Sequence, residues 1–402
     1  MTGQVPDTET VSYEKAVEEL KSRGSNRKDP AIESTREALQ ELGRPEEDCS
    51  VVLVGGTNGK GSVVEMGSEM LEDLGADTGV YKSPHLVSCR ERIKVNGEMI
   101  SRERFLELYK EIDALDVELS FFEFMTVMAF LQFSRQNVDY ALMEVGMGGR
   151  LDATNAAEPE VSVVTNIGLD HTEYLGEELE EIAREKSGII PENGKVVTGA
   201  TTPPLETVAD KRNSDIYRPV RLEEVGSSYR LGEEEFSIPV EGSFQKQNLE
   251  TAIALVETLE SRPRDLEKAL SGLECPGRME YISHKPDYIH DGAHNPPALE
   301  RIVEDLPEGF VCIFSALETK DISRMIEILE RKASRFYLTR SNVEWAAPPE
   351  EIARTVDSTP FETLQDPAEA VDRALEKAGP DDTVVVTGSL YLIGDVKKRE
   401  KG

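Results

Sequence analysis

A glycine-rich loop is the segment of this sequence with the clearest capacity for chemistry. Residues 51–54 form a short β-branched run, and Gly55 to Ser62 follow it directly before a helical stretch. Glycines let backbone N–H groups approach phosphate oxygens closely, and the N-terminus of a following helix adds partial positive charge. Lys60 can reach the terminal phosphates as a point charge. The loop residues predicted to bind phosphate are Thr57, Asn58, Gly59, Lys60, Gly61 and Ser62.

The spacing of this loop departs from that of the standard P-loop. Val54, rather than a glycine, stands six residues before Lys60, and Gly61 separates Lys60 from Ser62. The alternative is a tight strand-to-helix turn that carries an incidental lysine. The predicted strand and helix on its two sides favour phosphate binding.

Three polar side chains follow other predicted strands. Glu144 ends an apolar strand before a glycine-rich turn, and Ser83 and His171 each follow a strand of their own. Ligands collect at the carboxyl ends of strands in open α/β sheets, and oxygen ligands there can hold Mg²⁺ that bridges nucleotide phosphates. One interpretation is therefore a shared magnesium site. The other is that each residue serves only its own turn or helix cap.

A second polar segment lies near residue 290. Asp291 to Pro296 follow a predicted strand and precede a helix, which suits either an anion contact or a capping turn with proline at the helix start. His284 and His290 lie near strand positions and are interpreted as structural. By themselves these residues indicate a nucleotide-using α/β protein and little more.

The elements that must position these residues alternate between strand and helix, which predicts α/β layers with parallel sheets. A hairpin is predicted within 229–240, around Gly232. A fresh alternation begins near residue 273, so we expect two domains, 1–273 and 274–402. The predicted buried strands are 51–54, 140–144, 161–165, 195–198, 310–314, 336–339 and 383–386, and the predicted helices include 13–21, 31–42, 62–74, 245–259 and 263–270.

The charge of the chain excludes several classes of function. Asp and Glu number 78 against 45 Lys and Arg, which gives 402 residues a net charge of −33. Such a field repels nucleic acid and anionic membranes, so neither is an expected partner. The acidic residues are spread evenly and only 19 of the 45 basic residues are lysine. This pattern favours a halophilic source, where salt screens self-repulsion, over an ordinary acidic enzyme.

Three further features predict a cytoplasmic protein. The four cysteines, at positions 49, 89, 275 and 312, lack zinc-site spacing and are expected to be reduced thiols. The first residues are polar and acidic, unlike a signal peptide. The most apolar stretch, 121–133, is shorter than a membrane span and contains Glu123.

Taken in order, the motifs resemble the folylpolyglutamate synthase/dihydrofolate synthase branch of the Mur ligase family. The most specific match runs from Glu144 to Asn155. The unusual spacing of the phosphate loop also fits, because the family's loop has that form. Other matching segments, in the same order, are 38–62, 83–86, 91–93, 122–124, 168–171, 182–189, 245–248, 276–278 and 291–296.

The resemblance implies an N-terminal P-loop ATPase domain, a C-terminal Rossmann-like domain and an active site between them. It implies that ATP phosphorylates the carboxylate of dihydropteroate or of a folate, and that the amine of L-glutamate then attacks the acyl phosphate. The implied cofactors are ATP and Mg²⁺, with K⁺ as a further ion. We also expect the protein to be a monomer.

Individual roles follow from the resemblance. The residues with implied catalytic roles are Lys60, Lys186 and His294, the last of which is expected near the transferred phosphate. The implied ligands of one Mg²⁺ are Ser83, Glu144 and His171, and a carbamylated Lys186 is implied to hold a second Mg²⁺. The implied ATP contacts beyond the loop are Asn248, Arg278 and Asp291. The implied pterin-site positions are Phe122, Glu123, Leu151, Asp152 and Ala153.

The sequence also departs from the family pattern. Ser187 stands where alanine is frequent, Phe244 stands where histidine is usual, and 318–321 only loosely match the family's Lys-Asp motif. The alternatives are ligation of another amino acid or of another pterin-like acceptor, and a nucleotide-binding regulator without ligase activity. The joint presence of Lys60, Glu144, His171 and Lys186 argues against the regulator.

Overall fold

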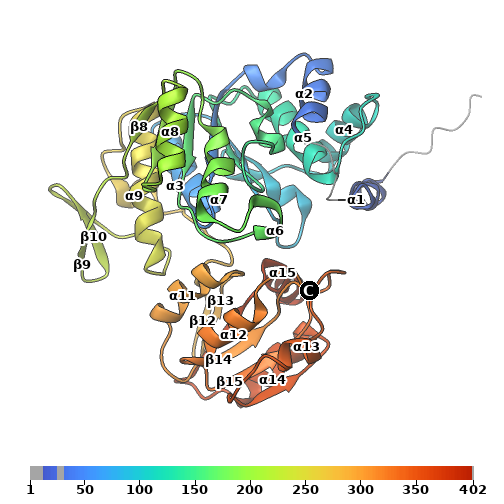
Figure 1. The fold of residues 1–402 in the computed structure, drawn as a ribbon, viewed down its shortest axis with the longest axis vertical. Helices are drawn as coiled ribbons and strands as arrows, with labels where there is room; N and C mark the ends of the chain where they lie inside the picture. Colours follow the sequence, from blue (N-terminus) through green and yellow to red (C-terminus); the bar gives the residue numbers. More distant parts are fainter. Residues whose placement is uncertain (1–11, 25–30, 401–402) are drawn as a thin grey trace, which may run out of the picture.

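The structure is a computed structural model that describes residues 12–24 and 31–400. Figure 1 shows two parts stacked along the long axis, an N-terminal part in blue to yellow and a C-terminal part in orange to red. An eight-stranded and a three-stranded sheet belong to the N-terminal part, and a six-stranded sheet belongs to the C-terminal part. The sheets lie on the two sides of residue 273, where the division into two domains was predicted.

The eight-stranded sheet has the order β4-β3-β2-β5-β1-β6-β7-β8. The strands β2, β5, β1, β6, β7 and β8 run parallel, and β3 and β4 extend the sheet antiparallel. β1 lies near the middle because its apolar run can be buried on both faces. The strands are β1 Ser50–Gly55, β2 Thr78–Tyr81, β3 Ile93–Val95, β4 Glu98–Met99, β5 Tyr140–Glu144, β6 Val161–Val164, β7 Lys195–Thr198 and β8 Asp215–Tyr217.

Helices cover both faces of this sheet. Val52 and Val54 of β1 point to the face that α3 and α9 cover, and Val51 and Leu53 point to the face that α1, α2, α4, α5 and α8 cover. The sheet is therefore the centre of two apolar cores. The helices of this part are α1 Tyr13–Ser22, α2 Ala31–Glu41, α3 Lys60–Asp73, α4 Arg102–Asp113, α5 Phe121–Gln136, α6 Thr172–Leu175, α7 Leu179–Lys186, α8 Pro203–Lys211, α9 Phe244–Leu259 and α10 Leu266–Ala269.

Local sequence explains where the site-bearing helices begin. Gly59 has a φ of 85° just before α3, a conformation that glycine adopts without strain. The helix therefore starts at Lys60, two residues before the predicted start. At α5, the hydroxyl of Ser120 accepts the N–H of Glu123, and the Glu123 carboxylate accepts the N–H of Ser120. This reciprocal capping box fixes the first turn of α5.

The C-terminal sheet has the order β12-β13-β17-β14-β15-β16, and only β12 is antiparallel to its neighbour within it. The helices α11, α12 and α13 cover one face, and α14 and α15 cover the other. The elements are β12 Glu280–His284, β13 Asp287–His290, α11 Pro296–Asp305, β14 Val311–Phe314, α12 Ile322–Glu330, β15 Arg335–Leu338, α13 Pro349–Ala353, β16 Phe361–Thr363, α14 Pro367–Lys377, β17 Thr383–Thr387 and α15 Leu390–Glu400.

The predicted alternation of strands and helices in an α/β fold is confirmed, with ends displaced by a few residues. The hairpin around Gly232 is also confirmed: β10 Ser228–Leu231 pairs antiparallel with β11 Glu234–Phe236, and Gly232 has a φ of 65°. A third strand, β9 Glu223–Val225, adds to it and was not predicted. The four cysteines are free, as predicted.

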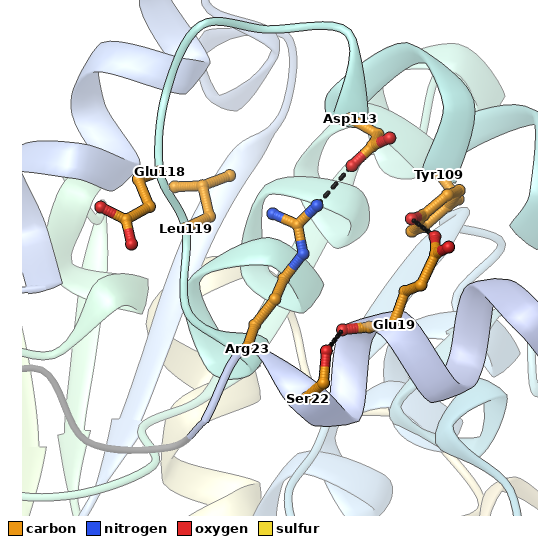
Figure 2. Close-up of a pocket in the computed structure, with 7 residues that line it drawn as sticks. All are labelled: Glu19, Ser22, Arg23, Tyr109, Asp113, Glu118 and Leu119. Carbon is orange, nitrogen blue, oxygen red and sulfur yellow. Dashed lines mark hydrogen bonds and ion pairs between the residues drawn. The ribbon is translucent and has the colours of Figure 1, made fainter.

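A surface pocket lies between α1 and α4 and shares no residue with the predicted site (Figure 2). Its main polar groups satisfy one another, since Arg23 bonds to Asp113 and the Tyr109 hydroxyl donates to Glu19 over 2.6 Å. Across the described residues, no helix is both long enough and apolar enough to cross a membrane.

Candidate active site

The predicted phosphate loop connects β1 to α3 and is held tightly in place. The ammonium of Lys60 folds back over the loop and donates to the carbonyl oxygens of Gly56 at 3.1 Å and Thr57 at 3.2 Å. A side chain at Gly59 would overlap the Asn248 amide oxygen of α9. The tight turn and the close approach of Asn248 therefore both require glycine at this position.

The segment after β6 supports the loop from one side. The hydroxyl of Thr165 donates to the Asn58 carbonyl at 2.7 Å, and the Asn166 side chain accepts the Asn58 N–H at 2.9 Å. The N–H of Gly168 donates to the hydroxyl of Thr57 at 2.9 Å. These bonds fix the loop before any phosphate arrives, which lowers the ordering cost of binding.

Two of the predicted metal ligands lie together at the end of β5. The backbone N–H of Ser83 donates to Glu144 Oε2 at 3.0 Å, and Glu144 is almost fully buried. A Cβ added at Gly61 would lie 3.5 Å from Glu144 Oε2, so the carboxylate directly faces the start of α3. The structure thus brings Ser83, Glu144 and the phosphate loop to one place.

His171 and Lys186 approach the same region from α6 and α7. Burial lowers the pKa of His171 to about 4, although Asp170 opposes this shift. The ammonium of Lys186 donates to the carbonyl of Gly56 at 3.0 Å. Burial, and then the charge of Lys60, lowers the pKa of Lys186 to about 7. At neutral pH the imidazole of His171 is uncharged, and Lys186 is neutral in a large fraction of molecules.

The donor atoms of this region suit a hard divalent cation. Among the described residues, no three or more His, Cys, Asp or Glu side chains gather in a metal-binding group. The predicted set has only two such residues, Glu144 and His171, which are a buried carboxylate and a neutral imidazole. A serine hydroxyl and phosphate oxygens would complete an oxygen-rich shell of the kind that Mg²⁺ prefers.

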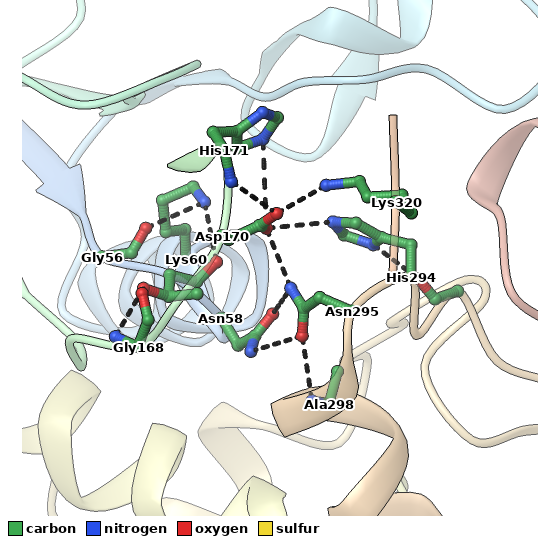
Figure 3. Close-up of polar contacts among 12 residues, drawn as sticks. Gly56, Asn58, Lys60, Gly168, Asp170, His171, His294, Asn295, Ala298 and Lys320 are labelled. Carbon is green, nitrogen blue, oxygen red and sulfur yellow. Dashed lines mark hydrogen bonds and ion pairs between the residues drawn. The ribbon is translucent and has the colours of Figure 1, made fainter. Parts of the chain in front are cut away.

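Asp170 forms the centre of a polar junction between the two parts (Figure 3). Its carboxylate accepts the Lys320 ammonium at 2.5 Å and the Asn295 amide at 2.9 Å. Asn295 also exchanges hydrogen bonds of 3.3 Å with the side chain of Asn58 in the phosphate loop. Burial would raise the pKa of Asp170, but Lys320, His294 and His171 hold it well below its ordinary value.

His294 presents one ring nitrogen to this junction. Its Nδ1 lies 2.8 Å from the Gly292 carbonyl oxygen, which can only accept, so Nδ1 carries the proton. Nε2 lies 3.8 Å from the Asp170 carboxylate. Burial, and then Lys320, lowers the pKa of His294 to about 4. A neutral imidazole therefore faces the boundary between the two parts.

A pocket continues from the phosphate loop into the C-terminal part. Asp291 lies in its wall and accepts the N–H groups of Met279 and Ala293, both at 2.8 Å. Burial raises the pKa of Asp291, and Arg278 opposes that shift. The residues lining this pocket come from four segments: Asn58, Gly59, Ser62, Phe244, Asn248, Arg278, Asp291, Ala293, Ala298, Arg301 and Ile302.

The predicted pterin positions occupy a separate cluster near Gly146. A Cβ added at Gly146 would lie 2.6 Å from the Phe122 ring and 3.2 Å from Asp152 Oδ2, so both side chains converge there. Asp152 accepts the Met147 N–H at 3.0 Å. Glu123 is fully buried and caps α5, so contact with a substrate stays a prediction for this residue. Leu151 is exposed and Ala153 is buried.

Four polar or charged residues of the junction and pocket were not among the predicted site residues: Asp170, Asn295, Arg301 and Lys320. Asp170 adjoins His171, Asn295 lies within the Asp291 to Pro296 segment, and Lys320 lies in the loosely matching Lys-Asp motif. Each of these three residues therefore lies in or beside a motif that could have identified it. Arg301 carries no motif signal, because only the packing of α11 brings it to the pocket.

The fold and these strand-end residues define an ATP-dependent ligase of the Mur type. Two family models match the chain. One, described as the Mur ligase middle domain, covers residues 54–256, and the other, described as the Mur ligase glutamate ligase domain, covers residues 277–390.

The chain belongs to the dihydrofolate synthase/folylpolyglutamate synthase family. It is 33% identical to the Bacillus subtilis protein of that name, over 92% of this chain and 95% of the relative. It is also 33% identical to a probable bifunctional folylpolyglutamate synthase/dihydropteroate synthase of Haloferax volcanii, but it spans only about half of that protein, 48%. A Yersinia pestis enzyme solved with AMPPNP and Mn is similar, with a TM-score of 0.89, 27% identity and coverage of 99% of this chain and 100% of the other. The Escherichia coli FolC complex with DHPP and ADP is also similar. Its TM-score is 0.89 and its identity 28%, with coverage of 100% of this chain and 99% of the other.

Proposed function

We propose that the chain joins L-glutamate to the carboxylate of dihydropteroate, of a folate, or of both, with conversion of ATP to ADP and phosphate through an acyl phosphate. The observation that carries this proposal is the pocket that joins the phosphate loop to Asn248, Arg278 and Asp291. A nucleotide bound there would touch both parts of the chain, as the family relationship leads us to expect.

The chemistry requires activation of a carboxylate. Its oxygen is a poor leaving group, and phosphorylation by ATP converts it into an acyl phosphate with a good one. Transfer of the phosphoryl group depends on positioning and on cations that offset charge. Lys60, folded over the loop, and Lys320, buried at the junction, supply such cations next to the predicted phosphate site.

A bound Mg²⁺ would neutralise phosphate charge during the transfer. We propose that Ser83, Glu144 and His171 hold it, and that a carbamylated Lys186 holds a second Mg²⁺. The close contact between Ser83 and Glu144 and the uncharged state of His171 support this set. K⁺ is a further ion of the proposal.

The acceptor carboxylate must reach the same place. Phe122 and Asp152 converge near Gly146, on the loop that follows Glu144, and offer an aromatic face and a carboxylate to a flat heterocycle. Burial raises the pKa of Asp152. We therefore place the pterin ring near these two residues. The glutamate amine would approach from the side of His294, whose neutral imidazole faces the junction.

We further propose that the enzyme acts as a monomer in the cytoplasm. One chain supplies both walls of the nucleotide pocket, so the proposed reaction needs no second copy. A gel-filtration mass of one chain during turnover would agree with this. A specific activity that rises with protein concentration would contradict it.

The direct test incubates purified protein with ATP, Mg²⁺, L-glutamate and either dihydropteroate or tetrahydrofolate. We expect a product heavier by one glutamyl residue, together with stoichiometric ADP, and mass spectrometry reads both. The matched variant Lys60→Met should bind nucleotide weakly and form no product. Tight nucleotide binding without ligation of either acceptor would contradict the proposal.

A further inference from the structure

One cationic side chain of the nucleotide pocket has no partner among the described residues. Arg301 of α11 lines the pocket together with Gly59 and Ser62 of the phosphate loop, and it is only partly buried. Across residues 12–24 and 31–400, its guanidinium makes no hydrogen bond and no ion pair. Arg278, the other guanidinium of the pocket, lies near the Asp291 carboxylate. Of the two guanidinium groups in the pocket, Arg301 is therefore the one that is available to bind a ligand.

The position of Arg301 along α11 indicates which end of a ligand it meets. Asn295, the N-cap of α11, bonds to Asn58 and so marks the phosphate end of the pocket. Arg301 lies six residues further on, which is about 9 Å along the helix at a rise of ~1.5 Å per residue. A nucleotide whose phosphates occupy the loop would therefore present its ribose and base to Arg301.

The side chains around Arg301 suit a planar base. Phe244, Ala298 and Ile302 form an apolar wall of the pocket. A purine can pack on such a wall while its ring nitrogens and the ribose hydroxyls remain at the edge. A guanidinium has five N–H donors in a planar fork, which matches those acceptors.

We propose that Arg301 is a nucleotide-binding residue that donates hydrogen bonds to the ribose and to purine acceptor atoms. The inference rests on the proposed function, because it requires a nucleotide in the pocket. Arg301 takes no part in phosphoryl transfer, because six residues of α11 separate it from Asn295 at the phosphate end. Its contacts are therefore equal in the ground state and the transition state, and they strengthen binding without changing the chemical step.

Binding calorimetry with two probes tests the proposal: ADP, which has a nucleoside, and inorganic tripolyphosphate, which has none. The Arg301→Met variant should bind ADP about tenfold or more weakly, as expected for loss of hydrogen bonds from a charged donor. Its affinity for tripolyphosphate should stay within about twofold of the unmodified protein. In the ligase assay the KM for ATP should rise while kcat is unchanged.

Two further variants control the experiment. Arg324→Met removes a guanidinium from α12, outside the pocket, and should leave both affinities unchanged. Arg301→Lys keeps the charge without the planar fork and should recover only part of the ADP affinity.

Unchanged ADP affinity in Arg301→Met overturns the inference. Equal weakening of ADP and tripolyphosphate also overturns it, since that result would mean general attraction of anions. If the unmodified protein bound no ADP, the proposed function itself would fail. Normal ADP binding with a null result at Arg301 would contradict this inference alone.

Discussion

Replacing Lys186 by methionine should stabilise the free protein at neutral pH and abolish ligation. Lys186 is 5% exposed, and its ammonium donates to the Gly56 carbonyl. Burial, followed by the charge of Lys60, lowers its pKa from 10.5 to about 7. The folded protein therefore pays a penalty whenever this amine is charged, and methionine of similar length does not.

The size and sign of the effect follow from that shift. Each tenfold change in proton affinity is about 1.4 kcal/mol, so a charged Lys186 costs the folded state at most about 5 kcal/mol. The folded pKa lies below the unfolded value, so the unfolded chain binds more protons between pH 7 and 10.5. Stability of the unmodified protein should rise with pH across this window. The advantage of the variant is therefore greatest at pH 7 and below, and shrinks towards pH 10.5.

Urea unfolding in metal-free, bicarbonate-free buffer measures this effect. We expect the Lys186→Met variant to gain a few kcal/mol at pH 6.5 and clearly less at pH 9.5. Lys211→Met, at an exposed position of α8, is the control and should show no pH-dependent gain. A variant that is less stable than the unmodified protein at pH 6.5, or one whose gain is equal at both pH values, would refute the reasoning.

Carbamylation requires the neutral form of the Lys186 amine, which the lowered pKa favours. Lys186→Ala should lose most ligase activity, and added acetate or formate should restore part of it by placing a carboxylate where the carbamate stood. Lys186→Arg should be inactive, because it retains charge and cannot form the carbamate. Near-normal activity of Lys186→Ala without added carboxylate would contradict a role as a metal ligand.

Four other outcomes are expected. Burial lowers the pKa of His290 to about 3, so the folded protein should lose stability as pH falls from 6.5 towards 3, and His290→Phe should reduce that loss in melting temperatures at pH 7 and 5. Glu65→Gln leaves two lysine ammonium groups without their buried counter-ion and should cost about 3–5 kcal/mol in urea unfolding. Gly394→Ala would drive a methyl group into the Leu86 carbonyl and should cost about 1–3 kcal/mol, read in the same assay. The melting temperature should rise steeply from dilute buffer to molar KCl, because salt screens the net charge of −33, and a flat profile would remove the halophilic interpretation.

The parts of the site that lie close together in sequence could be predicted from it. Gly59 and Lys60 follow a β-branched run, and Glu144 ends one, so strand ends and turn glycines mark their positions. Parallel strands place their carboxyl ends at one edge of the sheet. The convergence of Ser83 and Glu144 therefore follows from strand assignment alone.

Contacts between the two parts could not be predicted in this way. Asp170 and Lys320 are 150 residues apart, and only the packing of the two parts of the chain brings them together. Glu123 shows a different limit. Ser120 and Glu123 have the spacing of a capping box. This pattern indicates helix capping for the Glu123 carboxylate, whereas the family resemblance implies a position at the pterin site. Burial of the side chain in the structure favours helix capping.

The distribution of charge explains how such an acidic protein could bind the anionic reactants of the proposed reaction. ATP, glutamate and folates all carry negative charge, and a net charge of −33 repels them. At physiological salt this repulsion fades over about 8 Å, so groups inside the site govern the final approach. There the cations Lys60 and Lys320 lie at the phosphate loop and junction, and Arg278 and Arg301 line the nucleotide pocket. Asp170 and Asp291 are already engaged by protein donors. The site thus places cations behind a negative surface, and salt that screens the exterior favours access to them.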